Sequence, residues 1–148
     1  MTDSTATAIP SATAMERLFS DYGDAWESHD AAAIASFHAE DGVFHLHAGA
    51  DEIRGRDAIR DTFAGFLAQF PDLHFAEQQR MVEDWGWVVR WRMSGTLAQP
   101  FDTGSAVAQP GGRMDVDALD LITVEDGLLT AKHTYMDWAT ALRQMGIE

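Results

Sequence analysis

Residues 114–136 read MDVDALDLITVEDGLLTAKHTYM, and they predict a long β-hairpin around which the remaining elements can be placed. Apolar and polar residues alternate over 114–124, which is typical of a strand with one buried face. Residues 125–127 (Glu-Asp-Gly) favour a tight turn, and residues 128–136 return as the last strand. Asp120 falls on the apolar face of the first strand, where an acidic residue is unusual.

Three more strands, a loop and a short helix surround this hairpin in the sequence. Residues 43–47, 73–82 and 87–93 predict strands with alternating apolar positions. Residues 98–112 are rich in proline and glycine, so we expect a long mobile loop there, of the kind that often covers a binding site. Residues 137–145 predict a short closing helix.

Helical patterns gather in the first half of the chain. Thr13 and Glu16 form a capping box before an amphipathic helix. Asp30 caps a short second helix. Residues 55–70 predict a third helix that Pro71 ends. Early helices and late, hairpin-linked strands indicate an α+β fold, with a curved antiparallel or mixed sheet wrapped around three helices and an internal pocket.

Length and composition limit the organisation and the partners. With 148 residues, we expect a disordered lead-in over residues 1–12 and a single domain over residues 13–148. The net charge of -14 disfavours binding to nucleic acid or to anionic membranes. Cysteine is absent, which excludes disulfides and thiol catalysis, and the first residues lack the pattern of a secretory signal. We therefore expect a cytoplasmic protein.

Several short motifs resemble those of one superfamily. They are YGDAWESHDAAAI (22–34), FHAEDGV (37–43), GRDAI (55–59), VVRWRMSGT (88–96), ALDL (118–121), EDG (125–127) and YMDW (135–138). Together they resemble the ketosteroid isomerases and SnoaL-like polyketide cyclases of the NTF2-like superfamily. The resemblance covers nearly the whole chain after its first dozen residues, and it implies a cone-shaped fold, a homodimer and a small apolar ligand.

The resemblance also implies a site. In the isomerases, a tyrosine of the first helix and an aspartic acid of the penultimate strand form an oxyanion hole, and these positions correspond to Tyr22 and Asp120. A carboxyl group buried among apolar groups stays protonated and can donate a hydrogen bond to a developing enolate. This suggests an enzyme of the cyclase, isomerase or dehydratase type, without a cofactor, acting on a small apolar carbonyl compound.

The catalytic bases of the family are not reproduced. The base of the isomerases falls on Leu46, and the base of the cyclases and limonene epoxide hydrolases falls on Thr134. A replacement base could come from His133, Asp137 or a bound water. Two alternatives therefore stay open, a non-catalytic module that binds or carries a small ligand, and an enzyme similar to the epoxide hydrolases with an altered base.

The remaining candidates concern the pocket wall and metal binding. His45 and His47 have a spacing found in metal sites, with His38 or Asp41 as a possible third ligand, but two polar residues on an outer sheet face explain the pattern as well. We therefore assign no metal. The residues expected to line the substrate pocket are Trp26, Leu46, Phe63, Trp91, Phe101 and Thr134.

Overall fold

The computed structural model describes residues 11–147, whose helices and strands follow the expected order. The helices are α2 (Ser11–Glu27), α3 (Ala31–Ala35), α4 (Arg56–Gln69) and α5 (Trp138–Gln144). The strands are β1 (His38–His47), β2 (Ile53–Arg54), β3 (His74–Glu83), β4 (Gly86–Thr96), β5 (Phe101–Asp102), β6 (Val107–Ala108), β7 (Arg113–Glu125) and β8 (Leu128–Met136).

Six strands form the main sheet, in the order β2-β1-β8-β7-β4-β3. The predicted hairpin of β7 and β8 lies at its centre, with β4 and β3 continuing the antiparallel pairing on one side. On the other side β1 runs parallel to β8, so the sheet is mixed. The first strand of the domain is thereby held beside the last, and side chains from both ends of the chain can share one site.

Local sequence signals explain the element boundaries. Asp30 caps α3, because its carboxylate accepts hydrogen bonds from the backbone N–H groups of Ala32 and Ala33. The turn between β7 and β8 has positive φ at Asp126 (53°) and Gly127 (77°). Two consecutive residues with positive φ suit the right-handed twist of a two-residue hairpin, which is the turn that the Asp-Gly sequence favours.

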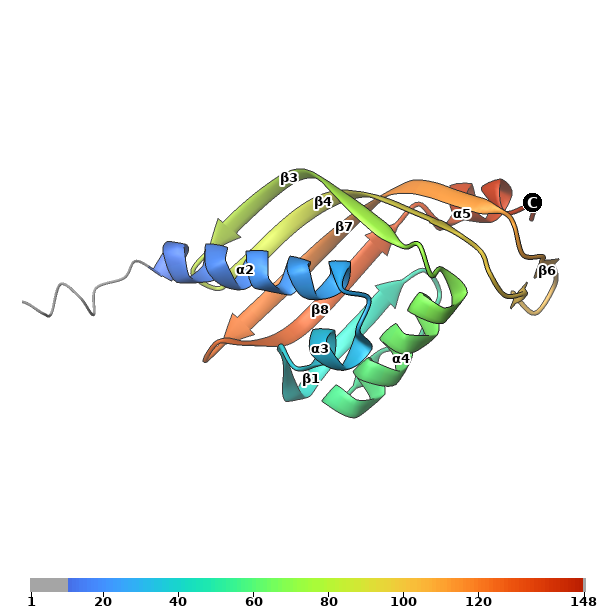
Figure 1. The fold of residues 1–148 in the computed structure, drawn as a ribbon. Helices are drawn as coiled ribbons and strands as arrows, with labels where there is room; N and C mark the ends of the chain where they lie inside the picture. Colours follow the sequence, from blue (N-terminus) through green and yellow to red (C-terminus); the bar gives the residue numbers. More distant parts are fainter. Residues whose placement is uncertain (1–10, 148) are drawn as a thin grey trace, which may run out of the picture.

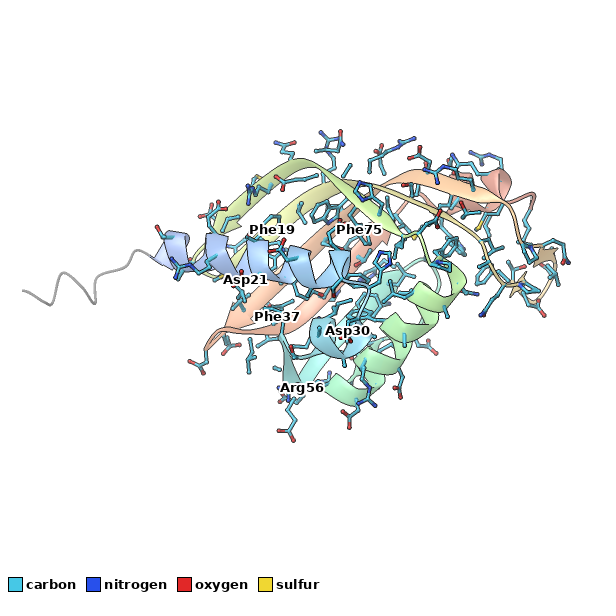
Figure 2. All side chains as sticks on the ribbon, in the orientation of Figure 1. Phe19, Asp21, Asp30, Phe37, Arg56 and Phe75 are labelled. Carbon is cyan, nitrogen blue, oxygen red and sulfur yellow. The ribbon has the colours of Figure 1, made fainter. Side chains whose placement is uncertain are left out.

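The helices cover one side of the curved sheet. Figure 1 shows α2 lying across the strands, with α3 and α4 beside β1 and α5 at the far end of β7. Phe19 of α2 stacks on Trp91 of β4, and Phe75 of β3 packs edge-on against the same ring. Figure 2 shows Phe19 and Phe75 between α2 and the strands. Aromatic contacts between α2 and the sheet therefore form one part of the core.

Three expectations about boundaries need correction or restriction. The lead-in expected over residues 1–12 lies outside the described residues, except for its last two, which already belong to α2. The strand expected at residues 43–47 begins at His38, five residues earlier, and its pairing with β8 is irregular between His38 and Val43. The expected loop over residues 98–112 contains the small hairpin of β5 and β6.

Of the helices found in residues 11–147, none has both the length and the apolar content that crossing a membrane requires.

Candidate active site

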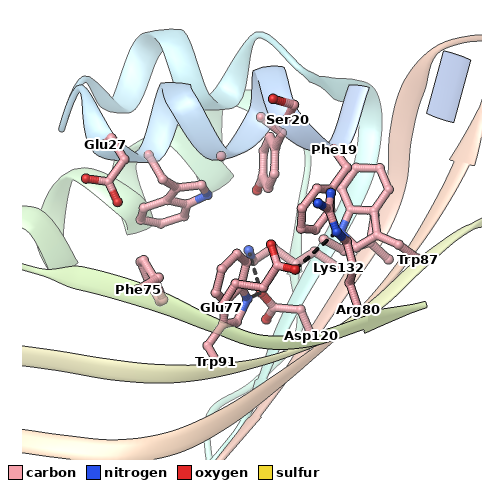
Figure 3. Close-up of a pocket in the computed structure, with 14 residues that line it drawn as sticks. Phe19, Ser20, Glu27, Phe75, Glu77, Arg80, Trp87, Trp91, Asp120 and Lys132 are labelled. Carbon is pink, nitrogen blue, oxygen red and sulfur yellow. Dashed lines mark hydrogen bonds and ion pairs between the residues drawn. The ribbon is translucent and has the colours of Figure 1, made fainter. Parts of the chain in front are cut away.

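Two cavities meet inside the curve of the sheet. The larger has a volume of about 650 Å³ and the smaller, drawn in Figure 3, about 300 Å³. The residues that line both are Trp26, Phe75, Trp91, Asp120 and Lys132. Asp120 and Lys132 are the only charged residues in this shared set, so an ion pair lies where the two cavities meet.

The wall of the larger cavity is mostly apolar. The structure places every residue expected there on this wall, namely Trp26, Leu46, Phe63, Trp91, Phe101 and Thr134. Contact of these residues with a substrate stays a prediction. A wall of this kind suits a small apolar molecule that is oriented by a few polar groups.

Asp120 is buried and surrounded by donors. Its Oδ2 accepts hydrogen bonds from Trp91 Nε1 at 2.9 Å and from Lys132 Nζ at 3.4 Å. Its Oδ1 accepts from the Thr134 hydroxyl at 2.5 Å. The strand pairing explains this convergence, because Asp120 on β7 lies directly opposite Thr134 on β8. All three contacts come from donors to the carboxylate oxygens, so this geometry presents Asp120 as an acceptor, and the donor role expected from the sequence stays a prediction.

Lys132 is the only lysine in the sequence, and just 6% of it is exposed. Its Nζ lies 5.1 Å from the ring centroids of Tyr22 and Trp26. Burial by itself lowers the pKa of Lys132, but Asp120 and Tyr22 reverse this and leave the pKa above its ordinary value. Within residues 11–147, Asp120 is the only hydrogen-bond acceptor of this ammonium group, so it keeps donors for a ligand.

In the described residues Tyr22 bonds to His38 and not to Asp120, and the oxyanion hole expected from Tyr22 and Asp120 stays a prediction. The hydroxyl of Tyr22 lies 2.8 Å from Nε2 of His38, and both side chains are buried. Burial raises the pKa of Tyr22, so the phenol stays protonated. Burial, helped by the charges of Lys132 and Arg56, lowers the pKa of His38 to about 3, so the imidazole is neutral at pH 7. Tyr22 and His38 thus form a neutral pair beside a charged one.

His133 and Asp137, the expected replacement bases, line neither cavity. The Nδ1 of His133 lies 2.9 Å from Nε2 of His47 on the outer face of the sheet. Asp137 caps α5, where it accepts hydrogen bonds from the backbone N–H and the hydroxyl of Thr140. These bonds lower its pKa, which makes Asp137 a weak base. A role of either residue in proton transfer stays a prediction and has no support from this geometry.

Sequence reasoning missed Lys132 and the internal position of His38. The signal for Lys132 was present, since it lies two residues before Thr134 and shares its face of the last strand. The alternation alone did not tell whether Thr134 or His133 pointed inward. A charged residue on an inner face is also the less common case, because burying a charge is unfavourable unless it is paired.

Solved structures support the fold. A candidate SnoaL-like polyketide cyclase from Jannaschia sp. CCS1 has a TM-score of 0.78 and 19% identity, and the match covers 94% of this chain and 96% of that one. IdmH, a candidate polyketide cyclase from Streptomyces antibioticus, has a TM-score of 0.71 and 23% identity over 89% of this chain and 98% of its own. A protein with a ketosteroid isomerase-like fold from Catenulispora acidiphila, in complex with trimethylamine, has a TM-score of 0.73 and 17% identity over 88% of this chain and 93% of its own.

Comparison of sequences points to the same group. No curated protein matches the chain. The SnoaL-like domain family matches residues 19–132, which span helices α2 to α4 and the sheet up to Lys132. The chain therefore belongs to the SnoaL-like domain family of the NTF2-like superfamily, whose fold binds small molecules.

Proposed function

We propose that this protein is an enzyme of the cyclase, isomerase or dehydratase type that acts on a small, largely apolar carbonyl compound. Lys132 donates a hydrogen bond to the carbonyl oxygen and stabilises the negative charge that develops there. The observation that carries this proposal is the buried ammonium group, which faces two cavities and has one acceptor, Asp120, among the described residues.

Burial strengthens the electrostatic effect of this ammonium group on a developing oxyanion. A charge that faces a developing oxyanion acts more strongly in a site of low dielectric than in water, and it is already in position before the reaction begins. The rings of Tyr22, Trp26 and Phe63 lie around Nζ and give it apolar surroundings. A substrate oxygen would supply an acceptor that the aromatic walls do not offer.

Asp120 has a supporting role in this proposal. Its carboxylate keeps Lys132 charged, and Trp91 and Thr134 hold that carboxylate in place. Because three donors already occupy the carboxylate oxygens of Asp120, we do not assign it the task of removing a proton. With His133 and Asp137 outside both cavities, the proton would leave through a water molecule in the larger cavity.

A phenol with a solution pKa near 7 tests the proposed anion site, because its ionised form resembles an enolate and absorbs differently from the neutral form. We expect the protein to bind the phenolate and to lower the pKa of the bound phenol. In Lys132→Met the bound phenol should stay neutral. With a carbonyl substrate in hand, the same variant should lose about 100- to 1000-fold in kcat, the usual effect of removing one oxyanion donor.

The matched control is Arg90→Met, which removes a positive charge from an exposed position of β4. It should leave phenolate binding unchanged. Circular dichroism on Lys132→Met would verify that the variant is folded. If folded Lys132→Met binds the phenolate as well as the wild type does, Lys132 does not form the anion site.

A second candidate function is a non-catalytic carrier that uses the same cavity. Leu46 and Thr134 favour it, because both line the cavity at the positions where relatives of the family carry a base, and neither side chain can take up a proton. Native mass spectrometry would separate the two functions. A carrier would retain a ligand that is released unaltered, whereas an enzyme would release a product of different mass or structure.

Assembly and location complete the proposal. We infer a homodimer from the family resemblance, and light scattering at micromolar concentration should give twice the mass of the chain. A monomer at that concentration would contradict the inference. The absence of cysteine from the sequence supports a location in the reducing cytoplasm, and the net charge of -14 supports partners other than nucleic acid and membranes.

A further inference from the structure

Three histidines meet on the outer face of the sheet, away from both cavities. His45 and His47 alternate with the inward-facing Phe44 and Leu46 on β1, and His133 lies on the neighbouring strand β8, paired in register with His45. One ring nitrogen from each lies within 4.8 Å of the other two. The parallel pairing of β1 with β8 is what brings the three side chains together.

We propose that His45, His47 and His133 form a binding site for one divalent transition-metal ion, with Zn²⁺ as the best fit. Zinc binds imidazole nitrogen at about 2.0–2.1 Å, so two nitrogens of a tetrahedral site are separated by about 3.3–3.4 Å. The nitrogens of His47 and His133 are 2.9 Å apart, and no distance in the cluster exceeds 4.8 Å. The side chains would rotate to bring the three nitrogens to the separations that an ion requires.

The orientation of His45 supports the site. Its Nε2 lies 3.0 Å from the carbonyl oxygen of Ala50. A carbonyl oxygen can only accept, so Nε2 donates in this bond, and Nδ1 is the nitrogen of His45 that could bind an ion. Histidines that bind metals usually donate their second N–H in this way, which fixes the tautomer and the ring orientation.

The other two histidines are held close together by their surroundings. The ring of His47 stacks between His45, at a centroid distance of 3.8 Å, and Tyr135, at 4.1 Å. One of the facing nitrogens of His47 and His133 carries the proton that they share at 2.9 Å. Binding of an ion would displace this proton, either to the second nitrogen of its ring or to solvent. Because protons compete with the ion for the ring nitrogens, metal affinity falls at low pH.

The ligand set defines the class of ion. Three imidazoles suit zinc, cobalt, nickel and copper, whereas magnesium and calcium prefer oxygen ligands. Three protein ligands also leave a fourth position for water, as in zinc sites that exchange their ligands. The sequence suggested His38 or Asp41 as the third ligand, but His38 is buried and bonds to Tyr22, and His133 takes that place instead.

Isothermal titration of untagged full-length protein with Zn²⁺ tests the site, and the visible spectrum of the Co²⁺ form reports its geometry. We expect one ion per chain and the strong absorption of tetrahedral Co²⁺. His47→Gln and His133→Gln should each weaken Zn²⁺ binding by at least about 100-fold, since each removes one of three ligands. His74→Gln, at an exposed position on β3, is the matched control and should bind as the wild type does.

Thermal unfolding supplies an independent readout. Zn²⁺ should raise the Tm of the wild type and of His74→Gln, because it binds the folded state, and should leave the Tm of His133→Gln unchanged. Equal Zn²⁺ affinity in the wild type and His133→Gln would overturn the proposal. A stoichiometry of one ion per two chains would also overturn it, since the ion would then join two molecules. Neither result bears on Lys132, which faces the opposite side of the sheet.

Discussion

Lys132 shows how one partner changes the chemistry of a buried amine. With Asp120 beside it, the pKa of Lys132 lies above its ordinary value, and the group stays an ammonium ion. An ammonium ion has no lone pair with which to attack a carbonyl carbon. The same lysine without its carboxylate would be governed by burial, which favours the neutral and nucleophilic amine.

We therefore predict that wild-type Lys132 forms no Schiff base at pH 7. Treatment with an aromatic aldehyde and borohydride should give no adduct on Lys132, whereas Asp120→Asn should give one. Because Lys132 is the only lysine, peptide mapping separates its adduct from one on the N-terminal amine. An adduct on wild-type Lys132 would show that the amine is available as a nucleophile and would contradict the role proposed for it.

His38 predicts how stability depends on pH. Burial first, and then the charges of Lys132 and Arg56, lower its pKa from 6.5 to about 3. Between these values the unfolded chain binds a proton that the folded chain does not. The folded state is therefore destabilised as the pH falls below 6.5, by up to about 1.4 kcal/mol per pH unit, and the effect is complete near pH 3.

Urea unfolding at pH 6.5 and pH 4.5 measures this contribution. The wild type should lose about 2 kcal/mol more stability over this interval than His38→Gln, whose side chain does not titrate but can still bond to Tyr22. The comparison between the two proteins cancels the acidic groups that both contain. Equal losses in the two proteins would mean that His38 does not remain neutral in the folded state.

At the scale of elements, the backbones of β4 and β7 approach each other closely at a glycine of β4. Gly86 has a φ of 146°, and a Cβ atom at this position would lie 2.0 Å from the carbonyl oxygen of Ile122. Both the backbone conformation and the close approach exclude a side chain. Since β7 carries Asp120, this contact also fixes the strand on which the site depends.

Gly86→Ala should therefore destabilise the protein by at least about 2 kcal/mol, through strain and a steric clash with backbone. Gly65→Ala is the matched control, because Gly65 lies in α4 with open space around its Cα. It should stabilise the protein by about 0.5–1 kcal/mol, since alanine favours a helix over glycine. Denaturation of the two variants measures both effects, and a similar stability of the two would contradict this account of Gly86.

At the scale of the whole molecule, the sequence predicted the order of elements and the inner face of β7. Alternation and turn residues are local properties, and they identified the central hairpin and its Asp-Gly turn. The early start of β1 at His38 was missed, because Glu40, Asp41 and Gly42 have the composition of a turn. The strand tolerates them through an irregularity in its pairing with β8, which is a tertiary effect.

The orientation of a site residue was predictable only where the alternation of its own strand determined it. Asp120 was placed inward by the alternation of its own strand, and the structure agrees. Its partner was not predictable in this way, because the contact with Lys132 depends on the pairing of β7 with β8 and on which face of β8 is inner. The histidine cluster depends likewise on the pairing of β1 with β8, two strands far apart in the sequence.

The parallel pairing of β1 with β8 also bears on how the chain folds. The strand that completes the centre of the sheet, Leu128–Met136, is the last of the described strands to leave the ribosome. Until it emerges, β1 and β2 have no sheet to join, and β7 exposes the edge that β8 later covers. Contacts between such distant segments slow folding. The nascent domain therefore stays incomplete until β8 has been made, and a chain that stalls before residue 128 would expose a long unpaired edge to other nascent chains and to chaperones.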